Sequence, residues 1–498
     1  MGFKEKLRRR RASYDNVRVV EKHAIHIQNI LTWISSTSSD TDKWERRNKF
    51  FRQCTESYLS FLIPSHSRIL CLGSGDGATL ASVSPSYGVG VDLDHASVTL
   101  AGERYPDLNF FQGDIEDPEV LRSLNEHGPF DVILLADTLG YLDDIQNFLA
   151  CTRQLCTPET RLVSVYYGYL WEPLLRLSEK CGLRKPSFDT TWLRMTDVEK
   201  FFCLAGFDTI KKEWRLLCPF ALFGIGQIIN RFVASLPLVR KLCVRHYLVA
   251  RRIPEVLAID QTVTVVIPCR NEKGNIEPAV TRLPELGSQM EVIFVEGHSS
   301  DGTWEEVERV KQAYPNLDIK SLRQLGEGKG DAVRAAFDVA RGDVLMILDA
   351  DLTVPPEDLP KFVEAIASGK GEFVNGSRLI YGMEDQAMRF LNYLANHVFA
   401  SVFTYLINQR LTDTLCGTKV LKRSDYQRIA ANRKYFGDFD PFGDFDLIFG
   451  ASKLNLKLVE IPVRYASRRY GSTQISRFRH GLLLLRMVIF AYRKLKAI

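Results

Sequence analysis

Short apolar runs recur along this chain, and most of them end in glycine, proline or an acidic residue. Longer stretches of mixed charge and apolar spacing lie between them, as expected for amphipathic helices. A short apolar run followed by a helical stretch, repeated several times, predicts an α/β fold with a parallel sheet. The runs fall into two series, at 68–72, 88–91, 108–113 and 130–135, and then at 262–267, 292–295 and 344–348. We therefore predict two doubly wound α/β domains.

The run at 344–348 leads directly into Asp349 and Asp351, and Pro355 and Pro356 follow. At the carboxyl end of a strand the chain turns, so both carboxylates are expected to reach a common point outside the sheet. Hard divalent cations prefer oxygen ligands and leave coordination positions for substrate phosphates. The stretch therefore predicts a metal–diphosphate site, although an isolated Asp-x-Asp tripeptide more often binds no metal.

In the first series, the run at 68–72 continues into Gly73, Gly75 and Gly77 and then a helix start. Glycines at such a turn permit positive φ angles and let a phosphate or nucleoside approach the backbone. Two later runs end in Asp92 and Asp114. In a doubly wound sheet Asp92 would lie beside the glycine turn and accept hydrogen bonds from a ribose.

Residues 20–215 resemble class I S-adenosylmethionine-dependent methyltransferases in these motifs, in the segment 130–135 and in the late element 191–207. The resemblance implies a Rossmann-like fold that binds S-adenosylmethionine. Gly73, Gly75 and Gly77 would border its methionine and ribose parts, Asp92 would hold the ribose, and Asp114 would lie by the adenine. Cys71 stands where many members of the family have an acidic residue. We expect four further residues either to line a pocket for the methyl acceptor or to pack in the core: Tyr141, Tyr166, Tyr167 and His95.

The segment 216–250 is apolar with scattered arginine and lysine. We interpret it as a helical extension that caps the first domain; helices lying on a membrane surface are the alternative. Arg251-Arg-Ile-Pro254 marks the boundary, so that the domains are expected to span 1–255 and 256–498.

The second half resembles glycosyltransferase family 2, which has the GT-A fold, and within it the dolichol- or polyprenol-phosphate mannose synthases. The resemblance covers about 260–475 and rests on the motifs at 267–272, 299–303, 328–330, 349–351, 375–378, 413–419 and 469–472. It implies that Pro268, Glu272 and Glu296 contact the nucleotide and that Lys329 lies near the donor. It also implies that Asp349 and Asp351 hold Mg²⁺ or Mn²⁺. Glu296 stands where the family usually has Asp, and Gly297 where a second Asp is common.

The acceptor side leaves two alternatives open. A hydroxyl nucleophile needs a general base, and the acidic stretch 436–446 offers Asp444 first, with Asp446 and Asp440 as alternatives. A lipid phosphate is already anionic and needs no strong base; Arg378, Arg389 and Arg469 would then pair with it bidentately.

Two segments favour a lipid acceptor. Residues 389–410 predict a helix with one wide apolar face, and the apolar run 481–491 has arginine and lysine on both sides. Such segments suit an anionic membrane surface, or else pack together as a core or dimer interface. No run is long and apolar enough for a transmembrane helix, and the N-terminus predicts no signal peptide.

Composition changes this picture little. A net charge of +5 does not indicate nucleic acid, and ten cysteines without Cys-x-x-Cys pairs favour a reducing compartment. We therefore expect a cytoplasmic enzyme at the inner face of the membrane. It would transfer a sugar from a nucleotide sugar to a lipid phosphate or glycan and would also methylate. The alternatives are a glycosyltransferase whose methyltransferase-like half is only a scaffold, and a module that binds a nucleotide sugar without turnover.

Overall fold

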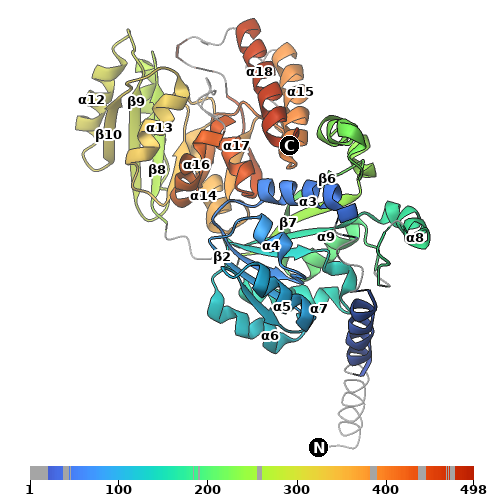
Figure 1. Cartoon of the computed structure of the whole chain (residues 1–498). Coiled ribbons are helices and arrows are strands. Elements are labelled where there is room, and N and C mark those ends of the chain that lie inside the picture. Colours follow the sequence, from blue (N-terminus) through green and yellow to red (C-terminus); the bar gives the residue numbers. More distant parts are fainter. Residues whose placement is uncertain are drawn as a thin grey trace, which may run out of the picture. The chain divides into compact units, whose positions relative to one another are not determined.

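The computed structural model divides the chain into two compact units, residues 1–253 and 254–498 (Figure 1). The described residues are 21–37, 44, 46–182, 184–188, 191–254, 261–381, 390–435, 445–466, 468, 470–471 and 477–498. Each unit is built on its own seven-stranded sheet. The predicted fold class, two doubly wound α/β domains, is confirmed.

The first unit has the strand order β3-β2-β1-β4-β5-β7-β6, in which β7 is antiparallel to both of its neighbours. Its strands are β1 (Arg68–Leu72), β2 (Tyr87–Asp92), β3 (Asn109–Gln112), β4 (Val132–Ala136), β5 (Arg161–Tyr167), β6 (Phe207–Arg215) and β7 (Arg245–Arg252). Its helices include 21–37, α3 (Lys49–Leu62), α4 (Ala78–Ser82), α5 (His95–Arg104), α6 (Pro118–Ser123), α7 (Ile145–Thr152), α8 (Glu172–Lys180), α9 (Met195–Leu204) and α10 (Ile225–Ile228).

Both faces of this sheet are buried. Along β1, Ile69 and Cys71 point into one apolar core with α3, whereas Leu70 and Leu72 point into a second core with α6, α7 and α9. Because successive strand residues face opposite sides, a strand covered on both sides is apolar throughout. This is why β1 appears in the sequence as a continuous apolar run.

The expected helical extension over 216–250 is wrong in its last part. Residues 245–252 form β7, a strand inside the sheet, and most of its side chains are buried. The strand was missed because it begins with Arg245 and ends with Arg251 and Arg252, residues that seldom lie in a core.

The second unit has the strand order β10-β9-β8-β11-β13-β12-β14. Its strands are β8 (Val263–Cys269), β9 (Met290–Glu296), β10 (Asp318–Arg323), β11 (Val344–Ile347), β12 (Phe373–Ser377), β13 (Lys419–Lys422) and β14 (Leu458–Pro462). Its helices are α11 (Lys273–Thr281), α12 (Thr303–Ala313), α13 (Lys329–Val339), α14 (Leu359–Ala367), α15 (Phe390–Ile407), α16 (Arg423–Ala431), α17 (Phe445–Lys453) and α18 (Arg477–Leu495).

The two helices expected from apolar spacing near the C-terminus are present as α15 and α18, and they pack against each other. Leu484, Met487 and Ala491 of α18 are buried, whereas Leu482, Leu485 and Ile489 are exposed. Among the described residues, no helix is long and apolar enough to cross a membrane.

Candidate functional site

The acidic pair after β11 lies at the carboxyl edge of the second sheet. Strand β8 pairs in parallel with both β9 and β11, so the last residues of these three strands meet at one edge. Pro268 stands near the end of β8, Glu296 ends β9, and Asp349 follows β11. Ligands of open α/β sheets bind at this edge.

Asp349 is held by a cation from a neighbouring helix. The Lys329 Nζ, on the first residue of α13, lies 2.6 Å from the Asp349 Oδ1. Burial acts to raise the pKa of Asp349, but the charges of Lys329, Lys419 and Arg378 outweigh it and lower the pKa below its ordinary value. The carboxylate is therefore ionised at neutral pH. Gly417 approaches it so closely that a Cβ there would lie 1.8 Å from its Oδ2.

Asp351 is held in a similar way. Its Oδ1 accepts hydrogen bonds from the backbone N–H and the hydroxyl of Thr353, at 3.1 and 2.9 Å. Its Oδ2 lies 2.6 Å from the Arg468 Nη2, and the Nη1 of the same guanidinium lies 3.1 Å from the Glu272 Oε1. Arg468 thus joins two of the predicted ligand-binding carboxylates.

These residues fit a divalent cation bound together with a diphosphate. Two partly exposed carboxylates, each facing a cationic side chain at 2.6 Å, provide hard oxygen ligands at a place where positive charge is already favoured. The described residues contain no cluster of three or more acidic, histidine or cysteine side chains suited to a metal. A cation here would accordingly take its other ligands from substrate phosphates and water.

The predicted nucleotide-contacting glutamates are both buried, and both are hydrogen-bonded to nearby residues. The Glu272 N–H donates to the Thr303 Oγ1 at 3.0 Å, and its Oε2 accepts from the Asn275 Nδ2 at 2.6 Å. Burial, opposed by Arg468 and Asn275, raises the pKa of Glu272. The Glu296 carboxylate accepts from the Ser299 N–H, which closes the turn after β9.

Arg378 is the one predicted phosphate-binding arginine that the structure describes, and its guanidinium is already engaged. Its Nε and Nη2 donate to the two carboxylate oxygens of Asp413, at 2.7 and 2.9 Å. Asp413 is fully buried and also accepts from the Asn396 Nδ2 and the Leu415 N–H. The bidentate pairing expected with a phosphate is therefore made with an internal carboxylate. Arg389 and Arg469 lie outside the described residues.

The general base preferred from the sequence also lies outside the described residues. Asp444 and its alternative Asp440 fall outside the described part of the chain. Asp446 is described; it is buried at the start of α17, and its Oδ2 accepts from the Arg433 Nε at 3.0 Å.

In the first unit, the glycine turn after β1 has the predicted conformation. Gly73, Gly75 and Gly77 all have positive φ, and the Gly75 N–H donates to the Asp92 Oδ2 at 2.7 Å. Burial raises the pKa of Asp92, because the backbone hydrogen bonds that its carboxylate accepts oppose the effect of burial only in part. Within the turn the buried Ser74 hydroxyl has no hydrogen-bond partner among the described residues. An unsatisfied polar atom in a glycine cradle fits a bound polar ligand such as S-adenosylmethionine.

Asp114 contacts a residue that the sequence analysis did not single out. The His23 Nε2, on the helix 21–37, lies 2.7 Å from the Asp114 Oδ2. Burial lowers the pKa of His23, but Asp114, Glu116 and Asp143 outweigh it and raise the pKa above its ordinary value. The same helix places the His26 Nε2 at 2.7 Å from the Tyr141 carbonyl oxygen.

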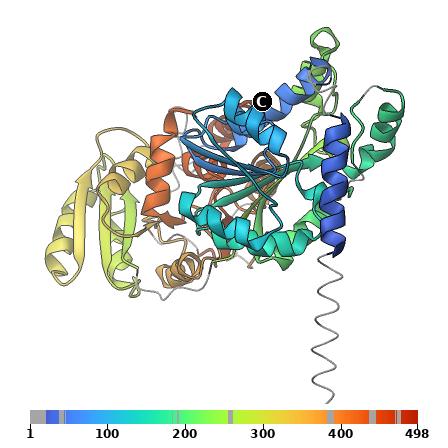
Figure 2. The ribbon, with the colours of Figure 1, turned by 60° about the horizontal axis from the view of Figure 1, so that its bottom comes forward.

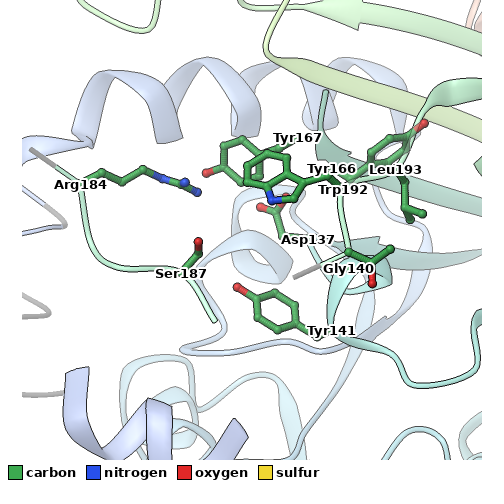
Figure 3. Close-up of a pocket in the computed structure, with 10 residues that line it drawn as sticks. Asp137, Gly140, Tyr141, Tyr166, Tyr167, Arg184, Ser187, Trp192 and Leu193 are labelled. Carbon is green, nitrogen blue, oxygen red and sulfur yellow. The ribbon is translucent and has the colours of Figure 1, made fainter. Parts of the chain in front are cut away.

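A pocket lies beside the carboxyl ends of β4 and β5 (Figure 3). Its empty volume is about 450 Å³, including the part open to solvent. Three of the four residues proposed from sequence line it; His95, the first residue of α5, does not. The lining residues are Asp137, Gly140, Tyr141, Tyr166, Tyr167, Arg184, Ser187, Thr191, Trp192 and Leu193.

The acidic side chain of this pocket is fixed by the strand that was not predicted. Arg245 of β7 donates from Nη1 and Nη2 to the two Asp137 carboxylate oxygens, at 2.6 and 2.9 Å. Its guanidinium also lies over the Tyr167 ring, 4.6 Å from the centroid, and so does that of Arg184. Asp137 follows a predicted strand and was therefore visible in the sequence, whereas nothing local indicated Arg245.

Each of the two α/β units carries a candidate site at the carboxyl ends of its strands. Residues 264–429 match the family model described as glycosyl transferase family 2, and residues 70–162 match the model of a methyltransferase domain. The methyltransferase match thus lies in the first unit and the glycosyl transferase match in the second.

Among known proteins, the dolichol-phosphate mannosyltransferase of Pyrococcus furiosus is 38% identical over 123 residues, which are 24% of this chain and 34% of that protein. The polyprenol monophosphomannose synthase of Mycolicibacterium smegmatis is 25% identical over 229 residues, which are 45% of this chain and 84% of that protein. A solved structure of a SAM-dependent methyltransferase from Thermotoga maritima, described as a possible histamine N-methyltransferase, aligns at a TM-score of 0.33. It is 13% identical, over 45% of this chain and 99% of that one. The chain thus spans about a third of the length of the Pyrococcus relative.

Proposed function

We propose that the second unit transfers a sugar from a nucleotide-sugar donor to a lipid phosphate, and that the first unit methylates with S-adenosylmethionine. The observation that carries the proposal is the carboxyl edge of the second sheet. There Lys329 contacts Asp349. Arg468 contacts both Asp351 and Glu272. The relatives named for dolichol-phosphate and polyprenol mannosyl transfer support a lipid phosphate as the acceptor class.

In this proposal Asp349 and Asp351 hold Mg²⁺ or Mn²⁺ on the donor diphosphate. The cation, when bound, compensates the charge that grows on the leaving nucleoside diphosphate. Lys329 contacts Asp349, and Arg468 contacts Asp351. When the metal ion takes their place at the carboxylates, these two side chains would pair with phosphoryl oxygens of the donor. Pro268, Glu272 and Glu296 border the nucleotide.

The acceptor would attack the anomeric carbon from the side opposite the leaving group, so that the configuration inverts. A lipid phosphate needs no deprotonation, which leaves positioning and electrostatics as the main contributions. Arg389 and Arg469 are then the arginines proposed for the phosphate. Asp444 is proposed as general base for a hydroxyl acceptor, such as a glycan.

For the methyl transfer, Gly73, Gly75, Gly77 and Asp92 would border the cofactor, with Asp114 by the adenine. S-adenosylmethionine supplies the electrophilic methyl group. The pocket lined by Tyr141, Tyr166 and Tyr167 lies next to the ends of β4 and β5 and would orient the methyl acceptor.

The decisive experiment measures transfer of radiolabelled sugar to polyprenyl phosphate, over a panel of nucleotide sugars with and without Mn²⁺. Transfer that requires Mn²⁺ and is lost in Asp349→Ala supports the proposal. Donor binding without hydrolysis or transfer under any condition would instead favour a nucleotide-sugar sensor.

A glycosyltransferase with a scaffold-like first unit is the second candidate. Two observations favour it: Cys71 is a buried thiol rather than an acid, and Asp114 is already paired with His23. Isothermal titration with S-adenosylmethionine separates the two candidates, because folded protein that gives no binding heat would support the scaffold.

Membrane attachment is proposed from the exposed apolar side chains of α18, Leu482, Leu485 and Ile489. It would place the enzyme at the inner, cytoplasmic face of the membrane, where a lipid-phosphate acceptor can be reached. Flotation with vesicles before and after deletion of 482–498 tests the role of α18.

A further inference from the structure

The segment 216–242 of the first unit exposes an unusual number of large apolar side chains. It lies between β6 and β7 and extends away from the sheet of its unit (Figure 2). Phe223 is 109% exposed and Leu238 is 90% exposed. The other large apolar residues exposed in the segment are Phe220, Leu222, Ile225, Ile228, Phe232, Val233, Leu236 and Leu242. Exposed apolar patches of this kind mark interaction sites.

The segment is built rather than loose. The Asn230 side chain holds its base, since its Oδ1 accepts from the N–H groups of Leu217 and Cys218 at 2.9 and 2.8 Å. Its Nδ2 donates to the Cys218 carbonyl at 2.7 Å. Ala234, Ser235 and Cys243 are buried and attach the segment to its unit. Because the base of the segment is fixed, the exposure of its tip, Leu222 and Phe223, is a property of the fold.

The tip itself has a backbone conformation that apolar residues rarely adopt. Leu222 and Phe223 have φ of 43° and 53°, in the left-handed region. Close by, a Cβ at Gly226 would lie 1.9 Å from the Phe220 carbonyl oxygen, so this tight turn requires glycine. Strained backbone of this kind clusters at functional sites.

The charge of the segment indicates what covers it. Residues 214–254 contain no aspartate or glutamate. In the segment 216–242, Arg231 and Lys241 are exposed and Arg240 is partly exposed. Exposed apolar side chains in a segment whose charged residues are all cations match the interface of an anionic bilayer, where rings enter the acyl region and cations meet lipid phosphates.

We propose that residues 216–242 form an interfacial membrane anchor, with Phe223 and Leu238 entering an anionic lipid bilayer. This goes beyond the proposed catalysis, because it assigns membrane contact to the methyltransferase unit as well as to α18. It also predicts that the anchor acts without any donor, metal or methyl cofactor.

The test is flotation of the full-length protein with vesicles of equimolar phosphatidylcholine and phosphatidylglycerol, against phosphatidylcholine alone. Binding is expected with the anionic vesicles and to fall as salt rises. The double variant Phe223→Asp with Leu238→Asp is expected to bind at least about tenfold less, because two large apolar groups no longer enter the bilayer. The matched control, Leu204→Asp with Leu325→Asp, changes side chains that are 67% and 97% exposed elsewhere and is expected to bind like the wild type.

A second measurement places the tip directly. A Phe223→Trp variant is expected to show blue-shifted fluorescence with anionic vesicles and quenching by brominated lipid. The anchor is refuted if the double variant floats like the wild type, or if Phe223→Trp shows no quenching. It is also refuted if the patch proves to be a protein interface, so that the double variant changes the sedimentation coefficient without lipid. Sugar transfer to a short, water-soluble polyprenyl phosphate should survive in the double variant, so failure of the anchor and failure of the proposed function are distinguishable.

Discussion

Replacing Arg378 by Met is expected to destabilise the second unit strongly. Arg378 has a side chain 12% exposed and Asp413 has one 0% exposed, and the two are joined by a bidentate ion pair. Arg378→Met leaves the Asp413 charge buried without its cation, which costs about 3–5 kcal/mol. For a unit of this size each kcal/mol lowers the melting temperature by about 2–4 °C, so the shift is on the order of 10 °C.

The matched control is Arg282→Met. Arg282 makes the same bidentate pair with Glu357, with both distances at 2.9 Å, but the two side chains are 32% and 55% exposed. Exposed pairs contribute about 0–1 kcal/mol, so this variant should melt nearly like the wild type. Differential scanning calorimetry measures both shifts, and hydrogen exchange of β12 peptides assigns the transition to the second unit.

The pH dependence gives a second test of the same pair. Burial acts to raise the pKa of Asp413, but Arg378 and Asn396 outweigh it and lower the pKa to about 2. A depressed folded-state pKa contributes stability that is complete above the unfolded value and is lost as pH falls toward 2. The contribution is about 2 kcal/mol.

The double variant Arg378→Met with Asp413→Leu should regain much of the loss, because no buried charge remains. Equal, small shifts for Arg378→Met and Arg282→Met would refute the reasoning. Arg378 would then be free to pair with a phosphate, as the sequence alone suggested.

The remaining predictions concern the two sites and the helix 21–37. Asp349→Asn should lower Mn²⁺-dependent sugar transfer at least about a hundredfold, because the amide is a poor ligand for a hard cation. If Asp92 holds the ribose as proposed, Asp92→Asn should weaken S-adenosylmethionine binding by about tenfold in isothermal titration, because one charge-assisted hydrogen bond would be lost. The raised pKa of His23 stabilises the contact with Asp114 fully below about pH 6.5, and that stabilisation is lost as pH rises through the folded-state pKa. Trypsin should then cleave within 21–37 faster at pH 8 than at pH 6, relative to a reference peptide. A His23→Gln variant should lose this pH difference. If the pH difference persisted in the variant, it would not arise from the contact between His23 and Asp114.

Much of the fold could be predicted because the parallel strands of a doubly wound sheet are covered on both faces. Such strands must be apolar throughout, so β1, β4, β8 and β11 are visible as runs in the sequence. Strand β7 was missed for the opposite reason. Its arginines lie in the sheet because Arg245 meets Asp137, a contact between residues 108 positions apart.

The sequence by itself determined where the strand ends fall, and therefore that Asp349, Asp351, Glu272 and Glu296 share one edge of a sheet. Only the tertiary structure decided which cation meets which acid: Lys329 with Asp349, Arg468 with Asp351, and Arg378 with the buried Asp413. Periodicity and turn residues act locally, so they can be interpreted along the chain. The pairing of charges depends on which distant segments bury them together, and that is decided by packing.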